Sequence, residues 1–221
     1  DAIYYDGPGN GQVDKTFRIA PIACEGCGVC AWFCAENAIE FAPVVNGHWF
    51  ISDTRMGPMV HAELGVAEEN SGKLVSLVRM EAKKLAIARD ADWVIIDGAP
   101  GIGCPVIASI TGADWVLIVT EPTPSGLHDL DRVAQLTKMF GIQTLACVNK
   151  WDLNPDMAAQ IESAARRLGI EDAGRIRYDR AVTDAQIEKL TLVEYTQTGA
   201  AVDMKTLWSK ISAKLLELQP R

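Results

Sequence analysis

Four cysteines crowd into eleven residues of this chain, and they constrain its fold more than any other feature. The spacing C-x2-C-x2-C-x3-C is formed by Cys24, Cys27, Cys30 and Cys34. Cysteines this close together usually bind a metal centre. Two-residue gaps let successive thiolates converge on one cubane, while Gly26 and Gly28 permit tight turns that aim backbone N–H groups at the sulfurs. The segment therefore predicts a 4Fe-4S cluster. A structural zinc site and four unligated thiols are the alternatives.

The fourth cysteine leaves the number of clusters open. In bacterial two-cluster ferredoxins, the last cysteine of such a run binds the other cluster. No second cysteine quartet occurs in the 221 residues. Cys34 therefore either closes a single cluster or joins ligands that lie outside this sequence. Ala35 stands where ferredoxins commonly carry proline, which we expect to change only the local stiffness of the backbone.

The charge and hydropathy of the chain exclude several classes of function. A formal net charge of -8 disfavours nucleic-acid binding through a basic surface, because phosphate neutralisation needs clustered Lys and Arg. No apolar run approaches the roughly 20 residues of a spanning helix, and the first residues have no signal-peptide pattern. We therefore expect a cytoplasmic protein with a packed core, without a nucleic-acid partner and without a membrane partner.

The composition and the hydrophobic pattern of the sequence change near residue 66. Residues 1–66 are rich in Gly, Pro and short strand-like pieces, so they predict a small, loop-rich module with a hairpin that turns at Asn46-Gly47. With its cysteine run, we expect this module to be the second half of a ferredoxin-type 4Fe-4S domain, as the family resemblance given below implies. Residues 67–221 alternate helices with short apolar strands, which is typical of a parallel sheet covered on both faces. The predicted fold class is α/β, with one domain over 67–221, whose nucleotide-binding character follows from the motifs and the resemblance given below.

Individual elements of the second region follow from apolar runs and capping residues. The predicted strands are 93–97, 115–120, 144–149 and 175–179. One predicted helix covers 71–90, and a second begins at the cap Ser125. A third has Asn154 as its cap, Pro155 as its first residue and Gly169 just past its end. A long C-terminal helix starts at about Ala201.

The end of the 93–97 strand carries a candidate catalytic residue. Asp97 is its last residue, and Pro100 and Gly101 shape the loop beyond it. A carboxylate at the carboxyl end of a strand can hold Mg²⁺ beside a triphosphate. Such an Asp can also simply cap a loop.

The end of the 144–149 strand carries a candidate base-recognition motif. Asn149, Lys150 and Asp152 form N-K-x-D, in which Asn and Asp offer hydrogen bonds to ring edges and the lysine stem can cover a ring. The alternative is a loop that caps the following helix.

Together these segments resemble the MinD/ParA class of P-loop ATPases, in particular the subgroup with an inserted ferredoxin domain. The resemblance is carried by SGKLVSLVR at 71–79, IIDGAPGIGCPVIAS at 95–109, TEPTPSGLHDLDR at 120–132, VNKWDLNP at 148–155 and GRIRYDRAV at 174–182. It implies that Asp97 is the Walker B carboxylate and that residues 100–104 form the phosphate-sensing switch. It also implies a base site of Asn149 with the 177–180 loop, including Tyr178 and Asp179. ATP with Mg²⁺ and a homodimer are further implications.

The glycine-rich phosphate loop of that class does not occur in this sequence. The nearest match to G-x4-G-K-[ST] is GNGQVDKT at 9–16, where Asp14 replaces the second glycine, and Gly72-Lys73 is followed by Leu74. We therefore expect this chain to be the C-terminal part of a longer polypeptide and to bind ATP poorly by itself.

Two further features have weaker functional interpretations. The resemblance extends to the nitrogenase iron protein, which carries a cluster-ligating cysteine in its corresponding switch. It implies a redox-coupled role for Cys104 in the switch segment, and the alternative is a small apolar residue at a helix start. Cys147 lies in an apolar strand and is expected in the core. An apolar stripe on the C-terminal segment predicts docking on the chain's own sheet or, alternatively, a membrane-binding helix. Its members are Met204, Leu207, Trp208, Ile211, Leu215 and Leu218.

The leading hypothesis for function is an iron-sulfur P-loop ATPase that couples ATP to electron transfer or cluster handling, with an unidentified redox partner protein. One alternative is a ferredoxin-type electron carrier on a non-catalytic α/β scaffold. The other is a MinD/ParA-like positioning ATPase with a structural cluster.

Overall fold

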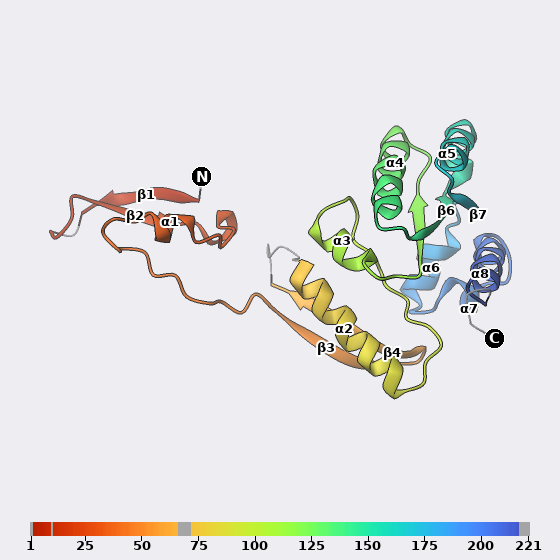
Figure 1. Ribbon diagram of the computed structural model, residues 1–221, viewed down its shortest axis with the longest axis horizontal. Coiled ribbons are helices and arrows are strands. Elements are labelled where there is room, and N and C mark those ends of the chain that lie inside the picture. Colours follow the sequence, from red (N-terminus) through yellow and green to blue (C-terminus); the bar gives the residue numbers. More distant parts are fainter. Residues whose placement is uncertain (1, 10, 66–71, 217–221) are drawn as a thin grey trace. The chain divides into compact units, whose positions relative to one another are not determined.

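A computed structural model describes residues 2–9, 11–65 and 72–216 of the chain (Figure 1). It divides into two compact units, Asp1–Val94 and Ile95–Arg221. Among the described residues, no helix is both long enough and apolar enough to cross a membrane.

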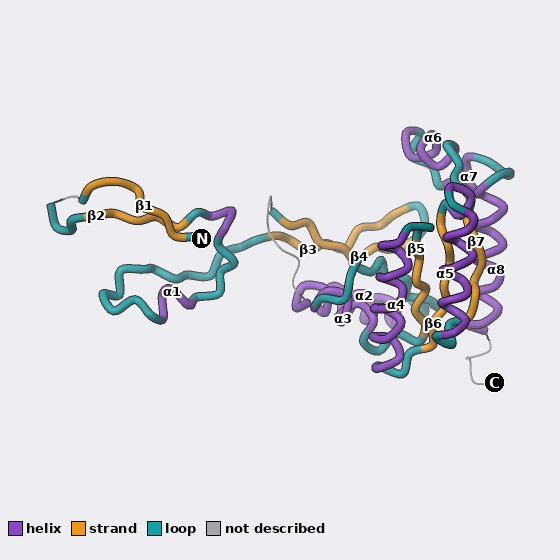
Figure 2. Tube along the Cα trace, turned by 90° about the horizontal axis from the view of Figure 1, so that it is seen from above, coloured by secondary structure: helices purple, strands orange, loops and turns teal. Residues whose placement is uncertain are grey.

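The first unit is built from two antiparallel hairpins with the cysteine segment between them. Strand β1 (Ile3–Pro8) pairs with β2 (Lys15–Ile19), and β3 (Gly47–Thr54) pairs with β4 (Gly57–Leu64). Between the hairpins lie the 3-10 helix η1 (Pro21–Ala23) and the single turn α1 (Val29–Trp32). The chain from α1 to β3 is loop (Figure 2).

The second hairpin turns at a different place from the one predicted. Asn46-Gly47 is not the turn, because Gly47 begins β3 and pairs with Leu64. The chain reverses between Thr54 and Gly57. There the Thr54 hydroxyl donates to the Gly57 carbonyl at 2.6 Å and accepts the Met56 N–H at 3.2 Å. These local side-chain bonds stabilise the turn at this place.

Helix α2 (Gly72–Ala88) packs on β4, so it is grouped with the first unit. Just after it, the Arg89 guanidinium lies 3.2 Å from the Asp53 carboxylate of β3. The helix predicted over 71–90 is confirmed for 72–88. The predicted domain boundary at residues 66 and 67 lies outside the described residues and stays a prediction.

The second unit is an α/β arrangement around a parallel sheet, as predicted. Its strands β5 (Trp115–Thr120), β6 (Gln143–Asn149) and β7 (Glu171–Ile176) pair in the order β5-β6-β7. Its longer helices are α4 (Pro124–Met139), α5 (Pro155–Arg167) and α8 (Ala200–Leu216). Shorter elements are α3 (Cys104–Ile110), η2 (Trp151–Leu153), α6 (Ala181–Ile187) and α7 (Leu192–Tyr195).

Strand β6 lies at the centre of the core and is buried on both faces. Ala146 and Val148 belong to one apolar cluster, which α4 and α5 cover with residues that include Leu130 and Ile161. Leu145 and Cys147 belong to a second cluster that contains Leu207 of α8. Because successive residues of a strand point to opposite faces, burial of both faces requires an uninterrupted apolar run. Cys147 is therefore a core residue, as predicted.

The C-terminal stripe docks on the sheet of its own unit. Leu207 is buried and Ile211 packs beside it against the cluster of Leu145 and Cys147. Met204 and Trp208 are 40% and 47% exposed, respectively. Leu218 and the side chain of Leu215 lie outside the described residues. The docking interpretation is confirmed for the middle of the stripe.

Three predicted elements differ from the structure. Residues 93–97 form no strand, and Ile95 is 79% exposed, because no neighbouring strand pairs with this segment among the described residues. The strand predicted at 175–179 is β7, which ends at Ile176. Helix α4 is capped by Thr123 rather than Ser125, since the Thr123 hydroxyl accepts the Gly126 N–H at 3.0 Å.

The cap predicted for α5 is confirmed. The side chain of Asn154 accepts the Met157 N–H at 3.1 Å, and Pro155 is the first helical residue. Gly169 follows the helix with a φ of 78°. These signals are local to the helix ends, so neighbouring sequence alone determines them.

Candidate functional site

The carboxyl ends of the three parallel strands bring several predicted site residues to one edge of the sheet. Glu121 follows β5, Asn149 ends β6, and Tyr178 comes shortly after β7. The polar residues lie together because β5, β6 and β7 are parallel neighbours, so their carboxyl ends meet at the same edge. In open parallel sheets, this edge is where ligands bind.

Lys150 joins the ends of β5 and β6. Its ammonium lies 2.6 Å from the Glu121 carboxylate, and its backbone is left-handed with a φ of 54°. Both side chains are more than a third exposed, so the pair contributes little to stability, but it orients the lysine. Sequence reasoning assigned no role to Glu121. Its signal was its position immediately after a buried strand.

Asp152 joins the N-K-x-D segment to the loop after β7. Its carboxylate accepts the Tyr178 backbone N–H at 2.7 Å. The structure therefore brings together Asp152 of the N-K-x-D motif and Tyr178, which the resemblance assigned to the base site. The Tyr178 side chain is 55% exposed. The side chain of Asn149 makes no hydrogen bond to the described parts of the chain, so its amide can serve a ligand.

Asp179 uses its carboxylate to hold two helix starts. It accepts the Ala181 N–H at 2.9 Å and the Ala200 N–H at 3.0 Å. These bonds, that of Ala200 first, lower the pKa of Asp179. A Cβ at Gly199 would lie 2.1 Å from the Asp179 Oδ2 atom, so only glycine fits there. Asp179 thus positions the Tyr178 loop.

Arg177 ties the same loop to the first turn of α8. Its guanidinium donates to both carboxylate oxygens of Asp203 at 2.7 and 2.8 Å, and its backbone N–H donates to the same side chain at 3.1 Å. The side-chain bond lowers the pKa of Asp203. Both backbone donors before Asp179 are therefore bound to carboxylates, which explains why β7 ends before this loop.

Asp97, Pro100 and Gly101 lie in a stretch without regular structure. Asp97 and Pro100 are exposed, and Gly101 has a φ of 84°. Within the described residues, no hydrogen bond or ion pair joins Asp97 to another side chain. The next residue but one, Ala99, packs against the cluster of α3 and α4. The structure does not bring Asp97 into contact with the polar groups of β6 and β7.

The cysteine segment has the donor set and backbone of an iron-sulfur site, but its thiols are not gathered in this structure. Cys24 and Cys27 are exposed, Cys30 and Cys34 are half-buried, and all four are free thiols. Within residues 2–9, 11–65 and 72–216, no three Cys, His, Asp or Glu side chains are arranged to hold a metal ion.

The backbone around the thiols suits cluster binding. Gly26 and Gly28 have φ values of 63° and 75°, as expected from their place between the cysteines. The Cys34 sulfur accepts the Ala38 N–H at 3.3 Å. Backbone hydrogen bonds to sulfur are a feature that tunes protein iron-sulfur sites. The residues therefore fit a cluster in ligand type, spacing and local conformation.

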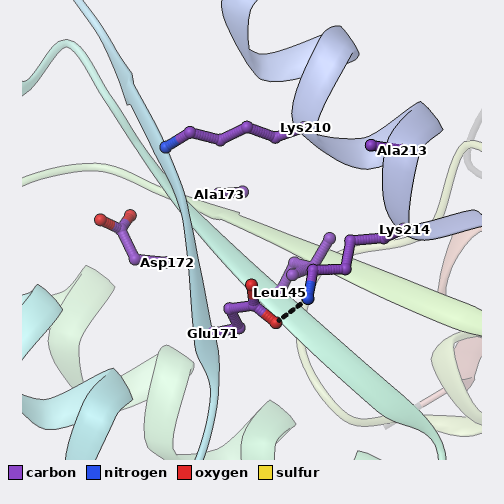
Figure 3. Close-up of a pocket in the computed structure, with 7 residues that line it drawn as sticks. All are labelled: Leu145, Glu171, Asp172, Ala173, Lys210, Ala213 and Lys214. Atoms are coloured by element: carbon purple, nitrogen blue, oxygen red, sulfur yellow. Dashed lines mark ion pairs between the residues drawn. The ribbon is translucent and has the colours of Figure 1, made fainter.

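A cavity of about 340 Å³ lies elsewhere in the second unit, between β7 and α8 (Figure 3). Glu171 and Asp172 line it from the start of β7, and Lys210 and Lys214 line it from α8. Lys214 pairs with Glu171 at 3.0 Å. Because this cavity lies at the amino end of β7, it is separate from the carboxyl-end site.

The chain has an α/β fold with a parallel sheet that resembles the MinD proteins. The MinD cell division protein of Aquifex aeolicus superposes with a TM-score of 0.56 at 19% sequence identity, over 74% of this chain and 68% of that one. The cell division ATPase MinD of Pyrococcus furiosus gives 0.54 at 21% identity, over 65% and 59%. No protein-family model matches the chain.

Curated archaeal proteins are similar in sequence. An uncharacterized protein of Methanocaldococcus jannaschii is 37% identical over 139 residues, which are 62% of this chain and 48% of that protein. An iron-sulfur cluster carrier protein of Pyrococcus horikoshii is 26% identical over 142 residues, 58% of this chain and 48% of the carrier. This chain spans about half the length of these two relatives.

Proposed function

We propose that this chain is the iron-sulfur and base-site part of a P-loop ATPase that handles iron-sulfur clusters. Residues 1–66 hold the 4Fe-4S cluster through Cys24, Cys27, Cys30 and Cys34, and residues 67–221 form the nucleotide-binding domain. The observation that carries the proposal is a four-cysteine segment joined to a MinD-like fold. Similarity to iron-sulfur cluster carrier proteins favours cluster handling over simple electron transfer.

The carboxyl edge of the sheet binds the base of ATP in this proposal. The free amide of Asn149 donates to and accepts from the base edge, while the exposed Tyr178 ring packs on its face. Asp152 and Asp179 hold the tyrosine loop, and Lys150 is held by Glu121. Asp97 would hold Mg²⁺, and Pro100 and Gly101 would form the loop beside the phosphates.

The phosphate loop comes from polypeptide outside this sequence, and the working unit is a homodimer. A switch segment that responds to the γ-phosphate can bias the position of an attached module. ATP binding and hydrolysis thereby control when the cluster site is open. The bound cluster supplies one-electron chemistry or is itself the cargo.

Cluster handling is tested by anaerobic reconstitution with iron and sulfide, followed by incubation with an apo-ferredoxin. We expect the visible absorption to move from this chain to the ferredoxin. A cluster that stays on this chain but is reduced and reoxidised reversibly would instead support the electron-carrier alternative.

ATP binding is tested by calorimetry on the isolated chain. We expect no saturation at micromolar Mg-ATP, because backbone N–H groups of a phosphate loop supply most phosphate contacts. Micromolar affinity would contradict the proposal that the phosphate loop lies outside this sequence.

A further inference from the structure

One glycine of the cysteine segment is covered by an aromatic ring. Among residues 2–65, as far as their burial is described, Gly28 alone is buried. The ring of Phe41 lies against it. A Cβ at Gly28 would be 3.1 Å from Phe41 Cε1 and 3.2 Å from its Cζ. The φ of Gly28 is 75°, a backbone conformation that favours glycine, and a Cβ there would press on the ring.

A turn after Cys34 reverses the chain and brings Phe41 back to Gly28. The Asn37 N–H donates to the Cys34 carbonyl at 3.1 Å, and Asn37 itself is left-handed with a φ of 49°. The Ala38 N–H donates to the Cys34 sulfur. This turn reverses the chain, so that Phe41 reaches a residue thirteen positions earlier. The ring therefore lies against Gly28, which is in the loop between Cys27 and Cys30.

We propose that Phe41 is a cover for the cysteine loop, which limits the access of water and oxidants to the sulfur of Cys30. Cys30 is half-buried and follows Gly28 by two residues, whereas Cys24 is exposed. The apolar surroundings of a metal centre control its solvent access and its reduction potential. The biological purpose of the cover rests on the proposed iron-sulfur function, but its first test does not need a cluster.

Simple core packing does not account for this contact. Phe41 keeps 57% of its surface exposed. The neighbouring aromatic residues Trp32 and Phe33 are 78% and 83% exposed. The ring of Phe41 therefore covers a loop of the cysteine segment without joining an apolar core.

The first test is thiol alkylation of the metal-free chain, read for each cysteine by mass spectrometry. In Phe41→Ala, we expect Cys30 to react with iodoacetamide about threefold faster or more, because thiol reactivity follows exposure. Cys24 should react at its original rate and serves as the internal reference. The matched control is Phe17→Ala, which removes an aromatic ring of the same unit that contacts Tyr5 instead. Equal Cys30 rates in all three proteins would overturn the proposal.

A double-mutant cycle isolates the ring contact from backbone strain. Gly28→Ala forces a methyl group into the ring and strains the backbone, so we expect it to accelerate alkylation of Cys30 as well. In the Phe41→Ala background the same change should accelerate it much less, because only the strain remains. Additive effects of the two substitutions would show that the ring does not cover the loop.

The second test uses the anaerobically reconstituted protein. Exposure to air should bleach the visible absorption of Phe41→Ala faster than that of the unchanged chain or of Phe17→Ala. If no cluster can be reconstituted, the proposed function fails while the alkylation test still decides the cover. If the cluster forms and all three proteins bleach equally, the cover fails while the proposed function stands.

Discussion

The two units of the chain differ in what stabilises them. In the second unit, Leu130 and Ile161 are 1% and 0% exposed within a continuous core. In the first, Trp32 and Phe33 leave most of their surfaces in solvent. A region that buries so little apolar surface relies on ligands or partners for stability. The described apolar core clusters therefore lie in the second unit, and we expect the order of the cysteine segment to depend on a bound ligand.

The largest effect is expected from a substitution in the cysteine segment, which should affect the first unit alone. Cys27→Ser should abolish nearly all bound iron after reconstitution. Chymotrypsin should then cut residues 2–65 on the order of tenfold faster than in the reconstituted unchanged chain, since metal binding couples to folding. The second unit should keep its resistance. Cys104→Ser is the control, because its thiol is outside the quartet. Unchanged proteolysis of both units would show that order in the first does not depend on the cluster.

The next largest effect is expected from a substitution in the core of the second unit. Ile161→Ala removes a fully buried side chain and should lower the free energy of unfolding by about 2–5 kcal/mol. Iron binding should be unaffected. Ile187→Ala, at a site 72% exposed, should change stability by less than about 0.5 kcal/mol. Urea unfolding followed by circular dichroism measures both. Loss of iron in Ile161→Ala would contradict the separation of the two units.

A smaller effect concerns the ion pair of Glu162 and Arg175, which link α5 to β7. The Glu162 carboxylate is largely buried and accepts the Arg175 side chain, with one bond of 2.7 Å. This bond lowers the pKa of Glu162 below its ordinary 4.5. Its contribution is therefore complete above pH 4.5 and is lost as the pH falls below that value.

Replacing Glu162 by Gln tests that pair. At pH 7 the variant should lose about 1–2 kcal/mol of unfolding free energy, because a charge-assisted bond is removed from a largely buried site. The difference between the variant and the unchanged chain should shrink at low pH, as measured by urea midpoints at pH 7 and pH 4. A constant difference would show that the carboxylate charge does not contribute.

The smallest effect concerns the candidate site. Lys150→Ala should change stability by less than about 1 kcal/mol, because the pair with Glu121 is exposed. A larger loss in urea unfolding would show that this pair is structural rather than held ready for a ligand.

Sequence predicted the fold best where burial is on both faces and the signals are local. Strand β5 has its predicted bounds, and the cap of α5 at Asn154 is confirmed. The hairpin turn was predicted from the preference of Asn-Gly for tight turns, but Gly47 pairs with Leu64 and the turn follows Thr54. The strand predicted at 93–97 needs neighbours that no described residue supplies.

The residue types of the candidate site could be predicted from the sequence, but the hydrogen bonds that join them could not. The cysteine spacing and N-K-x-D are visible in the sequence. The bond between Asp152 and Tyr178 spans 26 residues, as does the one between Arg177 and Asp203. Such pairs depend on how the strand ends and α8 meet, which no local pattern encodes. They show that Asp152 and Asp203 position the loop after β7, a role that their residue types alone did not indicate.

The central claim is that the cysteine quartet holds an iron-sulfur cluster, and metal analysis of the anaerobically reconstituted chain tests it most directly. We predict iron and acid-labile sulfide in equal amounts, with a broad visible absorption that bleaches on reduction. A colourless protein that contains zinc and no sulfide would contradict the claim.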